Sequence, residues 1–278
     1  MKNKLFLLVS GILFLAAACT GDGKNTASGQ SVRSAANYTI EAGGSTSVTP
    51  LMELFAGEYC KSKPNIKVNI NGTGSSDGIK NAGTLYQIGM SSRELTPAEQ
   101  GAGLKEEIVA IDGIAVIVNN SNPVDSLTVE QIRDIYTGAI TDWSQVSGGA
   151  KRGKIAVISR EEGSGTRGAF EELAGFQGKL LAGANESTST GAIKAGIAQN
   201  TDAVGYISLG SVDDSVKALA VNGIAPSGAN VKNGSYKIAR PFIVLTGNNV
   251  HAESAAFINW MLGEEGQKIA ARSWISVK

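Results

Sequence analysis

The sequence predicts an α/β protein with largely parallel strands, and two observations lead to this prediction. Short apolar runs alternate with longer stretches of helical periodicity along the chain, which is the pattern of repeated strand–helix units. Three of the runs are apolar at nearly every position: Ile111–Val118, Ile155–Ile158 and Phe242–Leu245. Runs of this kind are typical of central strands that helices cover on both faces.

The individual elements follow in order from residue 38. Strands are expected at Tyr38–Ile40, Ile66–Ile70, Leu85–Met90 and the three apolar runs, and Ile66–Ile70 alternates with a clean period of two. Helices are expected between them, at Leu51–Lys61, Val129–Tyr136, Arg167–Ala174, Ala192–Asn200 and Ala252–Ala271. Roughly 260 residues follow position 18, which is enough for one large domain or two ordinary ones.

The first 37 residues indicate export. Lys2 and Lys4 precede an apolar run, Leu5–Ala18, which is typical of a secretory signal peptide at residues 1–18. The run is too short for a permanent membrane span, which needs roughly 20 residues. The residues before Cys19 resemble a lipobox, so Cys19 is expected to carry lipid and to anchor the protein to the cell membrane, facing the periplasm or the extracellular side. An ordinary signal peptide cut near Ala18 is the alternative, and residues 19–37 are expected to form a flexible tether.

Charge and cysteine content narrow the possible functions. The chain has 25 Lys+Arg and 25 Asp+Glu; removal of Lys2 and Lys4 leaves 23 against 25, a net charge of about −2. This balance gives no support to a nucleic-acid partner, which normally requires a basic stripe. If Cys19 carries lipid, Cys60 has no disulfide partner, and its place in a predicted helix suggests a small buried hydrophobe; a single disulfide between the two cysteines is the alternative.

Three junctions between a strand and a helix combine glycines with small hydroxyl residues. They are Gly43–Ser47, Gly72–Ser76 and Gly163–Thr166, and Met90–Arg93 is a fourth that lacks the glycines. Glycine lets the backbone approach a ligand closely, and the free N–H groups at a helix N-terminus attract anions. One such junction would mean little because Ser and Thr cap ordinary helices, but several together predict an oxyanion site.

Arg160 follows the predicted strand Ile155–Ser159 and is the candidate cation of that site, because its guanidinium can bind a tetrahedral oxyanion with two hydrogen bonds. The alternative is a surface arginine paired with Glu161 or Glu162. A carboxylate beside a bound anion is costly unless it orients the arginine or accepts a proton from the ligand. Hydrogen phosphate has a proton to donate and sulfate has none, so an acceptor would favour phosphate.

The sequence does not support an enzyme or a metal site. His251 is the only histidine and is expected at a surface or a helix cap, and Gly163–Gly165 lacks the spacing of a serine nucleophile elbow. Residues 148–154 have the spacing of a phosphate-binding P-loop, but Ile155 replaces the Ser or Thr that would hold Mg²⁺. No Cys/His cluster suggests a metal, and no cofactor is expected. A serine-type hydrolase or phosphatase remains the enzymatic alternative.

From Tyr38 to the C-terminus the chain resembles the substrate-binding lipoproteins of bacterial phosphate ABC transporters. The resemblance rests on Gly44–Ser47, Gly74–Ser76, Ile88–Arg93 and Ser159–Arg167, and two stretches that resemble packing segments of the family, Leu127–Gly138 with Trp143 and Ala203–Leu209, also fit. It implies a type II periplasmic-binding-protein fold, with two α/β lobes that close on phosphate about a hinge near Val116–Asn120 and Ala239–Phe242. One lobe would contain residues 38–117 and 241–278, and the other residues 118–240.

The resemblance also implies the function and its residues. The protein would bind inorganic phosphate, act as a monomer and deliver the anion to the membrane permease subunits of an ABC importer. The implied phosphate-binding residues are Thr46, Ser47, Ser75, Ser92, Arg160, Ser164, Gly165 and Thr166. Many relatives have an aspartate at the position of Ser92 that accepts the proton of the ligand, so this role is open here, and Glu162 is the candidate to accept that proton or to orient Arg160. Binding of sulfate, molybdate or tungstate is the alternative.

Overall fold

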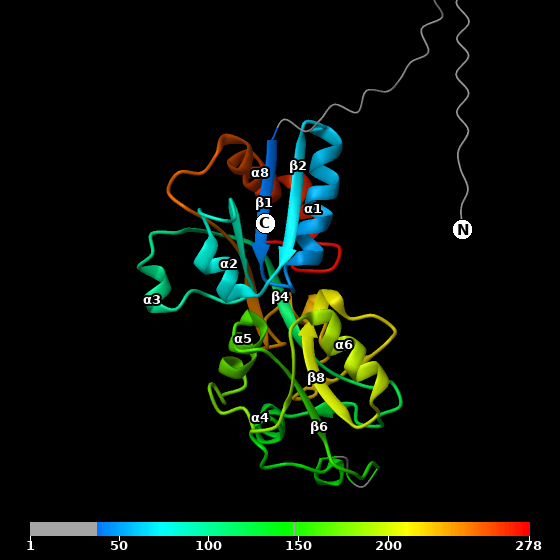
Figure 1. Cartoon of the computed structure of the whole chain (residues 1–278). Coiled ribbons are helices and arrows are strands. Elements are labelled where there is room, and N and C mark those ends of the chain that lie inside the picture. Colours follow the sequence, from blue (N-terminus) through cyan, green and yellow to red (C-terminus); the bar gives the residue numbers. More distant parts are fainter. Residues whose placement is uncertain (1–37, 147, 149) are drawn as a thin grey trace, which may run out of the picture. The chain divides into compact units, whose positions relative to one another are not determined.

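The computed structural model describes residues 38–146, 148 and 150–278 (Figure 1). The predicted signal peptide, Cys19 and the tether lie outside the described residues and stay predictions. No helix among the described residues is long and apolar enough to cross a membrane.

Strands and helices alternate along most of the described chain. The strands are β1 (Tyr38–Gly44), β2 (Ile66–Gly72), β3 (Ile88–Ser91), β4 (Lys105–Val118), β5 (Ser126–Leu127), β6 (Ala156–Arg160), β7 (Asn185–Ser187), β8 (Ala203–Ser208), β9 (Lys217–Ala218), β10 (Ala220–Val221) and β11 (Ala239–Thr246). The α-helices are α1 (Thr49–Ser62), α2 (Ser75–Asn81), α3 (Pro97–Gln100), α4 (Val129–Thr137), α5 (Gly165–Leu173), α6 (Thr190–Gln199), α7 (Gly228–Lys232), α8 (Ala252–Leu262) and α9 (Glu264–Ala270).

All the strands except β5 and β10 form one long mixed sheet in the order β2-β1-β3-β11-β4-β8-β6-β7, in which β9 also pairs with β4; β5 and β10 pair with each other. The outer pairs are parallel: β1 with β2 and β3, and β6 with β7 and β8. In the middle, β11 is antiparallel to both β3 and β4, and β4 is antiparallel to β8. The expectation of largely parallel strands therefore holds only for the two ends of the sheet. Apolar runs such as Phe242–Leu245 are equally suited to a buried antiparallel strand, so composition could not reveal the direction.

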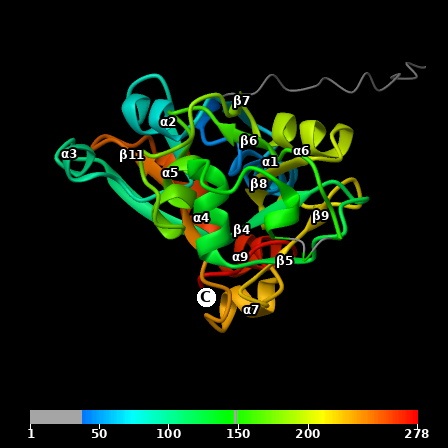
Figure 2. The same cartoon turned by 90° about the horizontal axis from the view of Figure 1, so that it is seen from below.

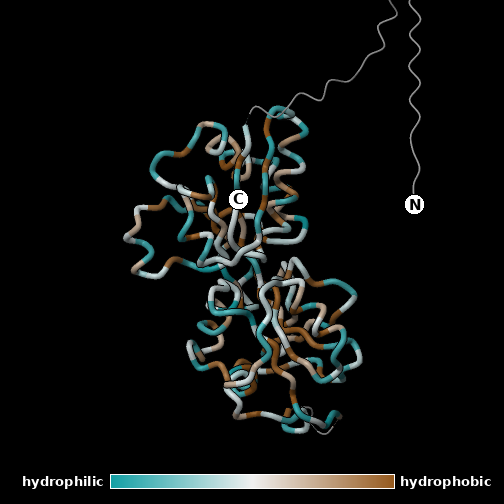
Figure 3. Tube along the Cα trace, in the orientation of Figure 1, coloured by the Kyte–Doolittle hydropathy of each residue, from teal (hydrophilic) through white to brown (hydrophobic). Residues whose placement is uncertain are grey.

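The two largest hydrophobic cores of the described residues lie in two lobes (Figure 1), and a smaller apolar cluster accompanies each of them. The core of lobe 1 combines residues from β1, α1, β3 and the N-terminal half of β4 with residues from β11, α8 and α9. The core of lobe 2 lies between Ile114 and Ile238 and contains Tyr136, Trp143, Phe170 and Tyr206. Figure 2 shows the molecule from the side of lobe 2, and in Figure 3 hydrophobic positions lie along the strands inside both lobes.

Two strands cross between the lobes, and both contribute to both cores. On β4, Val109 and Ala110 pack in lobe 1, whereas Ile114 and Val116 pack in lobe 2. Strand β4 continues without a break from Lys105 to Val118. Its side chains pass from the core of lobe 1 to that of lobe 2 a few residues before the predicted boundary at 117. On β11 the change occurs between Ile238 and Phe242. The exact lobe boundaries stay a prediction.

A buried ion pair joins the two crossing strands. Arg240 on β11 and Asp112 on β4 are register partners, and Nη2 of the arginine lies 3.1 Å from Oδ2 of the aspartate. Ser208 of lobe 2 donates to the other carboxylate oxygen at 2.7 Å. Burial raises the pKa of Asp112 and lowers that of Arg240, and the attraction between the two charges opposes both changes.

The end of the chain also spans the two lobes. Ile111 and Ile275 exchange two backbone hydrogen bonds of 2.9 Å, and Ile275 packs against the core of lobe 2. Trp274 lies so close to Gly210 that an added Cβ there would be 2.4 Å from the indole ring. The C-terminal segment therefore packs across the crossing strands.

Two predicted elements differ in extent, and the predicted burial of Cys60 is only partial. The helix expected over Ala252–Ala271 is two helices, α8 and α9, because Gly263 between them has an extended backbone with φ −76° and ψ 175°. Strand β3 begins only at Ile88, and Leu85 is 63% exposed in the turn before it. Cys60 is half-buried rather than buried.

Candidate functional site

The predicted hydroxyl residues lie at the ends of strands, where the chain turns into a helix or a loop. Thr46 and Ser47 lie between β1 and α1, and Ser75 is the first residue of α2. Ser92 directly follows β3. In lobe 2, Ser164 is the N-cap of α5, where its side chain accepts from the backbone N–H of Arg167, and Thr166 lies in the first turn.

The hydroxyls of lobe 1 form one hydrogen-bonded group. Ser45 donates its hydroxyl to Oγ of Ser92 at 2.8 Å, and Oγ of Ser75 lies 3.3 Å from the same oxygen. The backbone N–H of Ser92 donates to Oγ of Ser75 at 3.1 Å. All three residues are at most 2% exposed. The strand ends of β1 and β3 thus bring together groups that can donate or accept.

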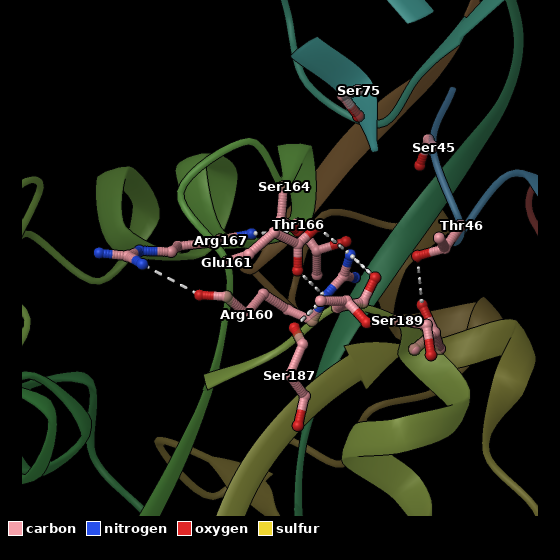
Figure 4. Close-up of polar contacts among 12 residues, drawn as sticks. Ser45, Thr46, Ser75, Arg160, Glu161, Ser164, Thr166, Arg167, Ser187 and Ser189 are labelled. Carbon is pink, nitrogen blue, oxygen red and sulfur yellow. Dashed lines mark hydrogen bonds and ion pairs between the residues drawn. The ribbon is translucent and has the colours of Figure 1, made fainter. Parts of the chain in front are cut away.

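A second set of hydroxyl contacts crosses from lobe 1 to lobe 2. Oγ of Ser47 lies 2.8 Å from Oγ1 of Thr166 and 3.0 Å from Oγ1 of Thr190, and Oγ1 of Thr46 lies 3.4 Å from Thr190. Figure 4 shows Ser45 and Ser75 of lobe 1 above Thr166 and Ser189 of lobe 2, with Thr46 beside them at the height of Thr166. The backbone N–H of Ser76 donates to the carbonyl of Gly163 at 3.1 Å. The two lobes are therefore in direct contact, which is a closed arrangement.

The surroundings of Gly165 leave no room for a side chain at this interface. A Cβ added to it would lie 2.2 Å from Oγ of Ser75 and 2.9 Å from Oγ of Ser92, both in the other lobe. The helix N-terminus of α5 can approach the hydroxyls of lobe 1 only because this position has no side chain.

Arg160 is the buried cation of the site, and Glu161 holds it. The arginine is 2% exposed; its Nε and Nη2 donate to the two carboxylate oxygens of Glu161 at 2.8 and 2.7 Å. The same two nitrogens also reach the carbonyls of Ser187 and Thr188 at 3.2 and 3.4 Å. Nη1 donates to no described residue, so this side of the guanidinium is available to a ligand.

The orienting role considered for Glu162 therefore belongs to Glu161. Glu162 is exposed and makes no hydrogen bond or ion pair with a described residue. The chain turns directly after β6, and this turn directs Glu161 back along the guanidinium of its neighbour, whereas Glu162 faces solvent. Both carboxylate oxygens of Glu161 accept hydrogen bonds from Arg160. Neither Glu161 nor Glu162 forms a hydrogen bond with the hydroxyls of Ser45, Ser75 and Ser92.

The strand end that carries Arg160 is fixed from behind by Tyr206. The tyrosine hydroxyl accepts from the backbone N–H of Arg160 at 3.1 Å and lies 2.8 Å from Oγ of Ser159. Burial raises the pKa of Tyr206 to about 12, so the hydroxyl stays protonated at neutral pH. Arg167 adds a hydrogen bond of 3.0 Å to the carbonyl of Arg160 (Figure 4). The position of the arginine is thus determined by the backbone as well as by its side-chain partners.

The interpretation of the sequence missed three members of the cluster: Ser45, Glu161 and Thr190. Thr190 is the first residue of α6, and the run Ser187–Thr190 brings small hydroxyls to a helix start as the three predicted junctions do, although its glycine, Gly191, follows the hydroxyls instead of preceding them. That signal was available in the sequence. Nothing in the sequence distinguished Glu161 from Glu162, because this depends on the turn after β6.

The composition of the site suits an anion better than a metal. The described residues contain no group of three or more His, Cys, Asp or Glu side chains placed to hold a metal ion. The cluster offers hydroxyls, helix N-termini and one guanidinium, which are donors for a tetrahedral oxyanion. His251 lies elsewhere, as the cap of α8: its Nδ1 accepts from the backbone N–H of Glu253 at 3.3 Å.

Comparisons with known proteins identify the family of the chain. The family model of the PBP superfamily domain matches residues 21–265. Phosphate-binding protein PstS of Borreliella burgdorferi is 30% identical over 245 residues, which cover 83% of this chain and 86% of that protein. Phosphate-binding protein PstS of Bacillus subtilis is 28% identical over 96% of this chain and 91% of its own length.

Solved structures show the same fold. The structure of a proposed phosphate ABC transporter substrate-binding protein from Clostridium perfringens, with bound phosphate, has a TM-score of 0.84 and 46% identity, covering 87% of this chain and all of that one. An ABC-type phosphate transport receptor from Vibrio cholerae has a TM-score of 0.70 and 37% identity, covering 86% of this chain and all of that one.

Proposed function

Because the chain belongs to the PBP superfamily and, within it, to the family of PstS-like phosphate-binding proteins, we propose that it binds inorganic phosphate outside the cytoplasm and delivers it to an ABC importer. It binds without catalysing a reaction, as a monomer, and is held at the membrane by lipid on Cys19. The phosphate-binding residues are Thr46, Ser47, Ser75, Ser92, Arg160, Ser164, Gly165 and Thr166, to which we add Ser45 and Thr190.

The observation that carries this proposal is the state of Arg160. Its guanidinium is buried and fixed on one side by Glu161, while Nη1 has no partner among the described residues. An oxyanion held among the hydroxyls would accept a charge-assisted hydrogen bond from Nη1. Hydrogen bonds to charged groups stabilise by about 1.5–3 kcal/mol each, so a few of them reach the roughly −8 kcal/mol of micromolar binding.

The charge balance of the site supports recognition of hydrogen phosphate mainly by hydroxyl groups. Glu161 compensates the charge of Arg160, so ligand selection depends largely on hydroxyls that can donate or accept. A hydroxyl can accept a hydrogen bond from the P–OH group of hydrogen phosphate, and it presents no fixed negative charge to the anion. Ser92 is placed for this role, since it is buried and lies within hydrogen-bonding distance of two other hydroxyls.

The test is titration calorimetry of the mature protein with phosphate, sulfate and molybdate. We expect phosphate to bind most tightly, and Arg160→Ala to weaken it more than tenfold. Arg133→Ala is the matched control, because Arg133 forms an exposed ion pair with Asp134 and should leave affinity within twofold. Sulfate or molybdate binding as tight as phosphate binding would contradict the assignment, and turnover of a phosphoester would favour a hydrolase.

A further inference from the structure

The Asp112 carboxylate accepts hydrogen bonds from more than one segment at the passage between the lobes. Its Oδ2 accepts from Nε and Nη2 of Arg240 on β11, at 3.2 and 3.1 Å, and its Oδ1 accepts from the hydroxyl of Ser208 at 2.7 Å. Ser208 is the last residue of β8 in lobe 2. Trp274, which packs in the core of lobe 1, donates its indole N–H to the same hydroxyl at 3.4 Å. One carboxylate thus connects a crossing strand, lobe 2 and, through Ser208, lobe 1.

The groups of this network are buried. The side chains of Asp112 and Arg240 are 0% and 1% exposed, and Ser208 is also fully buried. Removal of two opposite charges from water is costly, and apolar side chains of similar volume often stabilise a fold equally well or better. Stability alone therefore does not explain an ion pair at this place. Hydrogen bonds differ from apolar contacts because they are directional, and so they favour one relative arrangement of the segments that form them.

Asp112 and Ser208 lie on opposite sides of the point at which β4 passes between the cores. Ala110 packs in lobe 1 and Ile114 in lobe 2, and Ile114 is the register partner of Ser208. Rotation of lobe 2 about this part of β4 therefore moves Ser208 relative to both Asp112 and Trp274. A buried carboxylate that loses a donor is destabilised, so a rotation that breaks this bond costs free energy. The network consequently favours the closed arrangement that the structure shows.

We infer that Asp112, Arg240 and Ser208 form a hinge clamp, which stabilises the closed arrangement of the lobes and thereby sets phosphate affinity without contacting the ligand. The inference rests on the proposed function and assigns positioning residues to the same site. Within the described chain, the side-chain hydrogen bonds of the three residues involve no phosphate-binding residue. Affinity falls with the fraction of protein that is competent to close, so a change in closure changes the phosphate Kd.

The main-chain N–H of Ser76 provides a direct measure of closure. It lies in the first turn of α2, where a helix offers no internal acceptor, and it donates to the carbonyl of Gly163 in the other lobe at 3.1 Å. Hydrogen exchange of this amide should therefore accelerate when the lobes separate. This measurement does not depend on which anion the protein binds.

The experiment uses the full mature protein. Phosphate Kd is measured by calorimetry, exchange of the Ser76 amide by NMR without anion and at saturating phosphate, and stability by urea unfolding. One variant is Ser208→Ala, and the other combines Asp112→Leu with Arg240→Met, which replaces the ion pair by apolar side chains. We expect the Kd to rise more than fivefold in the first and more than tenfold in the second, with faster Ser76 exchange in both. The urea midpoint of the double variant should stay at or above that of the wild type.

Ser254→Ala is the matched control, because Ser254 is also a fully buried serine and lies on α8 within lobe 1; its Kd should stay within twofold and its Ser76 exchange unchanged. Wild-type Kd and exchange in both hinge variants overturn the inference. A raised Kd with unchanged Ser76 exchange in both conditions also overturns it, because the residues would then act on the ligand and not on closure. Failure of the wild type to bind phosphate defeats the proposed function, whereas Ser76 exchange in the anion-free chains still decides whether the hinge clamp exists.

Discussion

Arg160 and Glu161 are neighbours in the chain and form a two-point ion pair, with Nε and Nη2 of the arginine 2.8 and 2.7 Å from the two carboxylate oxygens. Consecutive residues at the end of a strand ordinarily point to opposite faces. The turn after β6 allows Glu161 to return to the guanidinium. The pair fixes the plane of the guanidinium and leaves Nη1 as the free donor.

Replacement of Glu161 should therefore affect ligand binding more than replacement of Glu162. Glu161→Ala removes both carboxylate contacts of the guanidinium and leaves only the longer ones to the carbonyls of Ser187 and Thr188, so Arg160 is held less firmly before the ligand binds and we expect phosphate affinity to fall severalfold by calorimetry. Glu162→Ala, one position further and exposed, should stay within twofold. Equal losses in the two variants would contradict the assignment, and tighter binding in Glu161→Ala would show that repulsion between the carboxylate and the anion dominates.

Gly165→Ala should prevent the observed closure. The new Cβ would lie 2.2 Å from Oγ of Ser75 in the opposite lobe, so the lobes would have to stay apart or the hydroxyls would have to move. We expect phosphate affinity to fall more than tenfold with little change in the urea midpoint, because the clash occurs between lobes rather than within a core. Gly228→Ala is the control, since nothing lies within 4 Å of its added Cβ. Normal phosphate binding by Gly165→Ala would show that the site does not need this approach.

Ser92→Asp tests how the ligand proton is recognised. An aspartate at the buried end of β3 would accept a proton from hydrogen phosphate and repel sulfate, which has none to give. We expect the ratio of sulfate Kd to phosphate Kd to rise above the wild-type ratio throughout pH 6 to 8, where phosphate always carries at least one proton and sulfate carries none. If the ratio is unchanged from pH 6 to 8, Ser92 does not contact the ligand.

Glu99 predicts a specific acid dependence of stability. Its hydrogen bonds with Arg93 lower its pKa from the ordinary 4.5 to about 2, so the native state binds this proton more weakly than the unfolded chain. The stabilisation is complete above about pH 4.5 and is lost as the pH falls towards 2. Urea unfolding of Glu99→Gln should therefore lose less stability than the wild type between pH 5 and 3. Glu53→Gln, an exposed residue without an ion pair, should follow the wild type.

Much of the candidate site was predictable because its chemistry lies in local sequence. A glycine, a small hydroxyl and a following helix are adjacent in the chain, so the junctions at Ser47, Ser75 and Thr166 could be found before any fold was known. Thr190 has a similar local signal, with its glycine after the hydroxyls, and was overlooked. Glu161 was not predictable in this way, because its role depends on the direction of a side chain after a turn.

The fold was predictable at the level of element type but not of strand direction. The apolar runs of β4 and β11 identify buried strands, yet their antiparallel pairing depends on partners that are distant in sequence. The length of β4 was underestimated because its first residues, Lys105–Glu107, are charged and exposed. The buried pair of Asp112 and Arg240 was missed for a related reason: 128 residues separate its members, and neither has a local motif.

The strand order has a consequence for how the chain folds. The core of lobe 2 comes from one unbroken stretch between Ile114 and Ile238, whereas that of lobe 1 needs both ends of the chain. In the finished sheet β11 lies between β3 and β4, but it is synthesised more than a hundred residues after either of them. Until it arrives, both strands present open hydrogen-bonding edges, which are sites of misassociation. A nascent or translocating chain should therefore complete its second lobe first and depend on protection of the unfinished first lobe until its last forty residues emerge.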